Sequence, residues 1–111
     1  MVDLSPTAVA QRLADLSRSL DTVQRELDAA DSAAVRCRHA YEIAYARAVL
    51  TSEGGNAETR KASATIATAD AGYQAECADQ VVRSLRVRVS VLRTQAEIGR
   101  SLGAALRAES V

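Results

Sequence analysis

One stretch decides the fold that this sequence predicts: TSEGGN, residues Thr51-Ser52-Glu53-Gly54-Gly55-Asn56. It contains the only Gly-Gly pair of the chain and ends in Asn, a residue type that caps helix starts. It falls almost at the middle of the 111 residues, so it divides the chain into two arms of similar length. The sequence therefore predicts an all-α antiparallel helical hairpin in one domain over residues 1–111. We expect a helix at about 5–51, a turn at about 52–57 and a helix at about 58–108.

The first arm begins with a helix start signal and continues as a heptad seam. Ser5 can accept from the free N–H groups of a first turn, and Pro6 has no N–H to leave unsatisfied. Apolar or small residues then follow in alternating steps of four and three, as in a coiled coil: Val9, Leu13, Leu16, Leu20, Val23, Leu27, Ala30, Ala34, Cys37, Tyr41, Ala44 and Ala48. The change from Leu and Val to smaller residues predicts closer helix approach along the second half.

The second arm repeats this period. Its seam contains Ala64, Thr68, Ala71, Ala75, Ala78, Val82, Leu85, Val89, Leu92, Ala96, Gly99, Gly103 and Leu106. One stretch conflicts with it, because residues 85–91 (LRVRVSV) alternate with the period of a half-buried strand. Helical seams flank this stretch on both sides and no partner strand is present, so we predict helix throughout.

The second arm has more apolar surface than one partner helix would cover. Ile66, Tyr73, Val81, Val91, Ile98 and Leu102 all lie off the seam. A lone pair of long helices has almost no interior, so a second copy of the hairpin is the simplest cover, in a four-helix or larger bundle. We therefore expect a homo-oligomer, most simply a dimer, with an oligomer or partner interface at Tyr73, Val81, Val91, Ile98 and Leu102.

Composition argues against several other classes of protein. The chain has 14 Lys+Arg and 14 Asp+Glu, so it has no net charge, and only 3% of its residues are aromatic. No apolar run is long enough for a membrane span, and the amino terminus lacks a signal peptide pattern, so we expect a cytoplasmic protein. Cys37, Cys77 and His39 form no metal-ligand or catalytic pattern. We expect no enzyme activity and no cofactor, and we expect both Cys side chains to be buried apolar groups.

Charge is unevenly distributed between the arms. Residues 1–31 are acidic and residues 80–108 are basic, and the hairpin places the two segments side by side. One interpretation is that these segments pair with each other and set the antiparallel register. The other concerns Arg86, Arg93, Arg100 and Arg107, which repeat every seven residues on one helix face. That stripe could contact nucleic-acid phosphates or an acidic protein partner.

Two residue pairs and one glycine motif depend on the register. If the hairpin folds about residue 57, Tyr41 faces the layer of Tyr73 and Cys37 faces that of Cys77. We interpret both pairs as packing rather than redox chemistry. Gly99 and Gly103 permit close helix approach or let the helix end fray.

Three runs together resemble a known group of proteins. They are Tyr41–Ala48 (YEIAYARA), Arg60-Lys61-Ala62 and Arg93–Leu102 (RTQAEIGRSL). The chain resembles, over most of residues 35–109, small and mostly uncharacterised coiled-coil accessory proteins of bacteriophages, notably those of actinobacteria. This resemblance implies an accessory protein in the cytoplasm of the host cell, and it implies no site residues.

These observations lead to two hypotheses. The first is a non-enzymatic coiled-coil module for oligomerisation and protein–protein interaction, acting on a host or phage protein. The alternative is a nucleic-acid-binding accessory in phage recombination or replication, with phosphate contacts from Arg86, Arg93, Arg100 and Arg107.

Overall fold

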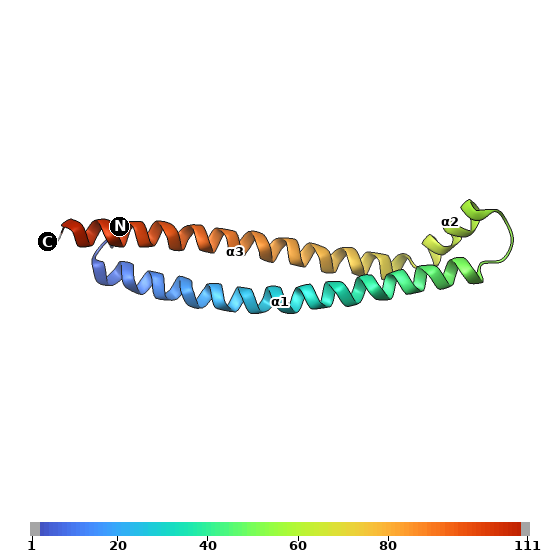
Figure 1. The fold of residues 1–111 in the computed structure, drawn as a ribbon, viewed down its shortest axis with the longest axis horizontal. Coiled ribbons are helices and arrows are strands. Elements are labelled where there is room, and N and C mark those ends of the chain that lie inside the picture. The colour runs from blue at the N-terminus through green and yellow to red at the C-terminus, as the bar shows by residue number, and fades with distance from the viewer. Residues whose placement is uncertain (1–2, 110–111) are drawn as a thin grey trace. The chain divides into compact units, whose positions relative to one another are not determined.

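The computed structural model describes residues 3–109, and these residues form three helices in chain order. They are α1 (Pro6–Thr51), α2 (Ala57–Ala67) and α3 (Ala69–Glu109), labelled in Figure 1. The fold is an all-α helical hairpin in which α1 and α3 are antiparallel, as predicted. Residues 85–91 lie within α3, so the helical prediction for the alternating stretch is confirmed.

Helix α1 begins as the sequence indicates. The Ser5 hydroxyl accepts a hydrogen bond from the Ala8 backbone N–H at 3.2 Å, and Pro6 is the first helical residue. The Ser5 carbonyl accepts from the Val9 N–H at 3.0 Å. Side chain and carbonyl together therefore satisfy donors of the first turn.

The turn between α1 and α2 depends on its two glycines. Gly54 and Gly55 have φ angles of 73° and 72°, in the left-handed region that side chains with a Cβ rarely adopt. Asn56 then caps α2, and its side-chain oxygen accepts from the Thr59 N–H at 2.9 Å. The predicted turn and cap are confirmed, because left-handed backbone and an Asx cap are both local requirements.

The second arm differs from the continuous helix expected at 58–108. It is interrupted at Thr68, whose φ of −111° and ψ of 19° lie outside the helical range. The buried Thr68 hydroxyl donates to the Ala64 carbonyl at 2.7 Å. Such a bond to the carbonyl four residues earlier bends helices, and the sequence pattern alone does not indicate where this happens.

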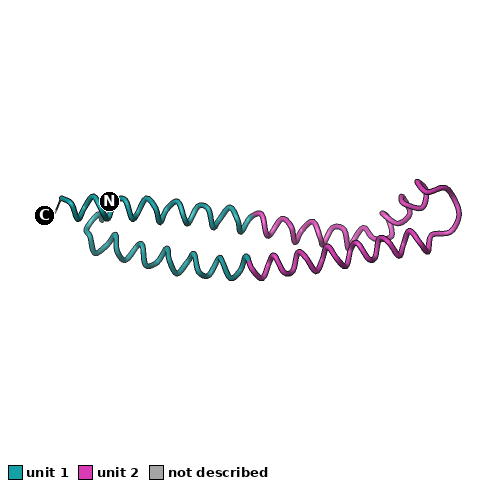
Figure 2. Tube along the Cα trace, viewed as in Figure 1, with its two compact units in different colours: residues 1–27, 84–111 teal, residues 28–83 magenta. Residues whose placement is uncertain are grey.

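The chain divides into two compact units, shown in Figure 2. Unit 1 contains residues 1–27 and 84–111, and unit 2 contains residues 28–83. In each unit a segment of α1 packs against an antiparallel segment of α3, and unit 2 also contains α2 and the turn. This division into units does not test the prediction of a single domain over residues 1–111, which stays a prediction.

The core of both units is the predicted seam. Every predicted seam position of both arms is buried or half-buried. Unit 1 buries mainly larger side chains, namely Val9, Leu16, Val23 and Val89, whereas unit 2 buries Ala34, Ala64, Thr68, Ala75 and Val82. The predicted change from larger to smaller core side chains is therefore present.

The register differs from the one expected for a fold about residue 57. In unit 1, a Cβ placed on Gly99 would lie 2.8 Å from Leu13 Cδ2, and one on Gly103 would lie 3.6 Å from Val9 Cγ1. In unit 2, a Cβ on Gly72 would lie 3.2 Å from the Tyr41 ring. Tyr41 is therefore matched to Gly72 instead of Tyr73, and the glycines in α3 permit close approach to α1.

Candidate functional site

Helix α3 of unit 1 has two flanks outside its seam. Arg86, Arg93, Arg100 and Arg107 each directly follow a seam residue, and we call them the arginine flank. Val91 and Ile98 lie two residues before Arg93 and Arg100, which is about 160° away around a helix. The arginine flank therefore lies on a different side of α3 from Val91 and Ile98.

The apolar side of this segment is largely uncovered. Val87, Val91 and Ile98 expose 64%, 50% and 63% of their surface, whereas Leu102 is half-buried. We call these four residues the apolar face of unit 1. Residues 87, 91, 98 and 102 are spaced by four, seven and four, so they recur on one side of a helix. The face includes three of the predicted interface residues, Val91, Ile98 and Leu102.

Val87 is the member of this face that the sequence analysis did not select. It lies in the stretch whose alternation resembled a strand, where a helical face is harder to see. Its spacing of four from Val91 was the available signal. Once residues 85–91 are known to be helical, Val87 and Val91 share a side of α3.

Unit 1 has no equivalent apolar face on α1. Among its described residues, the exposed large apolar side chains are Leu4, which precedes α1, and Val87, Val91 and Ile98 on α3. Outside the seam, the α1 segment is mostly Ala, Ser, Thr and charged residues. Any apolar contact that the helices of unit 1 make with another molecule is therefore centred on α3.

Two members of the arginine flank, Arg93 and Arg100, make no ion pair with the described acidic residues at the start of α1, whereas the pairing of the two segments as a whole stays a prediction. All four Arg are exposed, and no carboxylate of residues 3–109 lies within ion-pair distance of Arg93 or Arg100. The α1 residues that directly follow Val9, Leu16 and Val23 are uncharged: Ala10, Ser17 and Gln24. Asp15 pairs with Arg18 of its own helix. Arg93 and Arg100 therefore keep their charges available.

An ion pair between the helices does occur in unit 2. Arg38 of α1 donates to Asp79 of α3, and these residues directly follow the seam residues Cys37 and Ala78. Residues at this flanking position face each other across a coiled-coil seam. This pair was not among the sequence-based predictions, although opposite charges at flanking positions were a readable signal.

Unit 2 has its own exposed apolar side chains. On α1 they are Val35, Ile43 and Leu50, and on α2 and α3 they are Ile66, Tyr73 and Val81. The predicted interface residues Tyr73 and Val81 are thus exposed here, in the unit that does not contain the other three. The structure does not bring the five predicted interface residues together within one unit.

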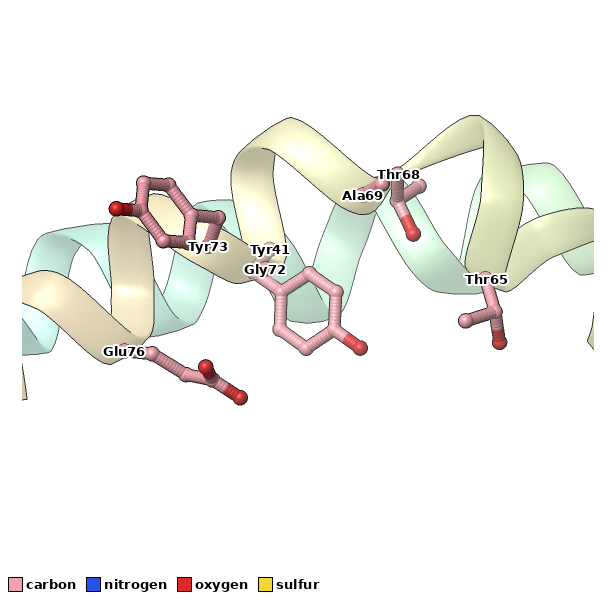
Figure 3. A pocket seen from close by; sticks show the side chains of 7 residues that line it. All are labelled: Tyr41, Thr65, Thr68, Ala69, Gly72, Tyr73 and Glu76. Carbon is pink, nitrogen blue, oxygen red and sulfur yellow. The ribbon is translucent and has the colours of Figure 1, made fainter.

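A shallow cleft of about 250 Å³ lies where α2 and α3 meet. Its lining, drawn in Figure 3, comprises Tyr41, Thr65, Thr68, Ala69, Gly72, Tyr73 and Glu76. The Tyr73 ring extends away from Tyr41 and 68% of the residue is exposed, so the expected packing of these two aromatics is wrong. Tyr41 instead packs beside Gly72 and lies 6.2 Å from Tyr45, measured between ring centres.

The Tyr73 phenol interacts with Cys77 one helical turn later. A hydrogen bond with the Cys77 side chain raises the pKa of Tyr73, and the negative charge of a Cys77 thiolate raises it further. Both Cys residues are free thiols. The expectation that both are buried is wrong, because Cys77 is exposed and Cys37 is half-buried. Ala75 and Ala78 occupy the seam in this part of α3, so Cys77 lies outside it.

No metal centre or membrane span is found in the part of the chain that the structure describes. Across residues 3–109, no three His, Cys, Asp or Glu side chains gather closely enough to hold a metal ion. None of the three described helices contains an apolar stretch long enough to cross a membrane. Comparison of the chain with protein-family models, curated proteins and solved structures finds no match.

Proposed function

We propose that this chain is a non-enzymatic helical-hairpin module that acts by binding proteins, its own copies included. The observation that supports this most strongly is the uncovered apolar surface outside a complete seam. Val87, Val91 and Ile98 are at least half exposed in unit 1, and Val35, Leu50 and Ile66 are more exposed still in unit 2. Exposed apolar clusters on soluble helices mark surfaces for partners.

The distribution of polar groups supports the same proposal. The cleft beside Tyr41 contains phenol, hydroxyl and carboxyl groups, but it is open and its Glu76 is exposed to solvent. A catalytic centre requires a nucleophile, a base and an orienting group within reach of one another. The exposed apolar side chains therefore support a protein-binding function better than this cleft supports a catalytic one.

The test is the mass of the purified protein in solution over a concentration series. Size exclusion with multi-angle light scattering, after nuclease treatment in high salt, should give a mass of two or more chains at micromolar concentration. A single-chain mass throughout, together with no binding to any protein after expression in an actinobacterial host, would contradict the proposal.

The resemblance to phage accessory proteins supports a role on a host or phage protein inside the host cell. Affinity capture from infected and uninfected cells tests it. A protein recovered at constant stoichiometry from the cytoplasmic fraction, and lost when Val91 and Ile98 are changed to Lys, is the expected result. Recovery that does not depend on these two residues would contradict binding through the apolar face of unit 1.

A second candidate is nucleic-acid binding by the arginine flank. The observation that favours it is the exposure of Arg93 and Arg100 without an ion-pair partner among residues 3–109. Phosphate contacts release counterions, so the affinity for DNA should fall steeply as salt rises. Titration of single-stranded and duplex DNA with the wild type and an Arg93→Gln Arg100→Gln variant tests this. An affinity that changes with neither salt nor the substitutions excludes phosphate contacts.

A further inference from the structure

The accessible surface of this chain is large for its mass. It measures 8069 Å². A folded monomer of 11.8 kDa exposes about 5,900 Å² by the usual scaling of area with mass, so this chain exposes about 2,200 Å² more. A specific protein–protein interface of ordinary size covers about 800 Å² on each partner. The surplus is therefore large enough for an interface with a second copy.

The position of the exposed apolar side chains in unit 1 indicates which helix such a copy would contact. A symmetric dimer uses the same patch on both chains, so the patch must be self-complementary. In the described helices of unit 1, all exposed large apolar side chains lie on α3. A symmetric apolar contact through this unit must therefore place α3 of one copy against α3 of the other.

Side-chain size favours one orientation of the two helices. A parallel, in-register pair would place each residue of the apolar face against its own copy, Val against Val and Leu against Leu. An antiparallel pair centred near Thr94 instead places Val87 and Val91 against Leu102 and Ile98. A smaller side chain then meets a larger one at each level, which fills the contact more evenly.

We propose that two copies of this chain associate through the apolar face of unit 1, with the two α3 helices antiparallel and their symmetry axis near Thr94. This proposal rests on the proposed function and names its partner as a second copy. Arg93 and Arg100 lie about 160° around α3 from Val91 and Ile98, so both stay outside the contact.

The first experiment compares two pairs of exposed apolar residues. The variant Val91→Lys Ile98→Lys introduces charges into the proposed contact, and the matched control Ile43→Lys Leu50→Lys introduces the same charges into exposed positions of α1 in unit 2. In light scattering at fixed concentration, the first variant should fall from two chains to one while the control keeps the wild-type mass. Circular dichroism should give the same helix content for all three proteins.

The outcomes separate this proposal from the proposed function. A dimer that survives Val91→Lys Ile98→Lys, or that the control dissociates, overturns the α3 contact and leaves the interaction module intact. A wild type with a single-chain mass at every concentration overturns the dimer itself.

The second experiment tests the antiparallel orientation by disulfide cross-linking. In a Cys37→Ala Cys77→Ser background, Thr94→Cys lies near the proposed axis, and Ala105→Cys lies eleven residues further along the exposed side of α3. Oxidation should cross-link the Thr94→Cys protein. It should not cross-link the Ala105→Cys protein, because the antiparallel arrangement separates its two thiols by about 33 Å along the helices. Cross-linking at both positions means parallel helices and overturns the orientation.

Discussion

Leu13 of α1 packs against the backbone of Gly99 in α3, so closely that a Cβ on Gly99 would lie 2.8 Å from Leu13 Cδ2. One turn further along α3, a Cβ on Gly103 would lie 3.6 Å from Val9 Cγ1, an ordinary contact distance. These two glycines therefore differ in the space available to a side chain, although both belong to the same seam. The difference sets the expected effect of the smallest substitution at each position.

Replacing each glycine with Ala should separate helix propensity from packing. In a helix interior, Ala is favoured over Gly by about 1 kcal/mol. Gly103→Ala should therefore raise the free energy of unfolding by about 0.5–1 kcal/mol. Gly99→Ala should gain less, because Leu13 must shift to accommodate the methyl group. Urea unfolding followed by circular dichroism measures both, and a Gly99→Ala protein more stable than Gly103→Ala would contradict the close contact.

The two turn glycines should also respond differently to Ala. Both have left-handed φ angles, where a Cβ costs about 1–2 kcal/mol. A Cβ on Gly54 meets nothing within 4 Å, whereas one on Gly55 would lie 3.0 Å from Thr59 Cβ. Gly55→Ala should therefore lower the free energy of unfolding more than Gly54→Ala. Thermal unfolding of the two variants at equal protein concentration measures the difference, and equal losses would argue against the Thr59 contact.

Truncation of one buried and one exposed valine in α1 should test the seam. Val23 is 2% exposed and Val35 is 69% exposed. Val23→Ala should lower the free energy of unfolding by about 2 kcal/mol, from lost apolar burial and the cavity left behind. Val35→Ala should cost little, because Ala has the higher helix propensity and the side chain is not in the core. A loss at Val35 as large as at Val23, measured at equal protein concentration, would place Val35 in an interface.

The Tyr73 phenol should titrate at higher pH than an ordinary tyrosine. Its raised pKa comes first from the hydrogen bond with Cys77 and then from the thiolate charge of Cys77. Cys77→Ala should therefore shift the Tyr73 titration down, as measured by tyrosinate absorbance in a Tyr41→Phe Tyr45→Phe background.

The sign of the accompanying stability effect follows from the direction of this shift. Because folding raises the pKa, the protonated phenol favours the folded state. That contribution is present below the ordinary tyrosine pKa and is lost as the pH rises through the raised value. Stability should thus decline at alkaline pH more in the wild type than in Cys77→Ala. An unchanged Tyr73 titration in the variant would exclude the Cys77 contact as the cause.

Much of the fold could be predicted from the sequence because its determinants are local or periodic. Ser5 and Pro6 begin α1, Asn56 caps α2, and each acts on backbone groups within one turn. The seams follow from the period of seven, and every predicted seam position is buried or half-buried. For the candidate site, the exposure of Val91 and Ile98 could be predicted because both lie outside the seam of the second arm.

The rest required the tertiary structure, because a heptad seam is periodic and matches its partner at more than one register. The position of Tyr41 against Gly72 and the ion pair between Arg38 and Asp79 both depend on the register. The interruption at Thr68 depends on a competition between its side chain and the helical backbone, which residue types alone do not resolve. The sequence by itself determined two helical arms and a turn, through local capping and period. The tertiary structure decided which side chains meet and which remain exposed, because only packing distances select one register among those that the period allows.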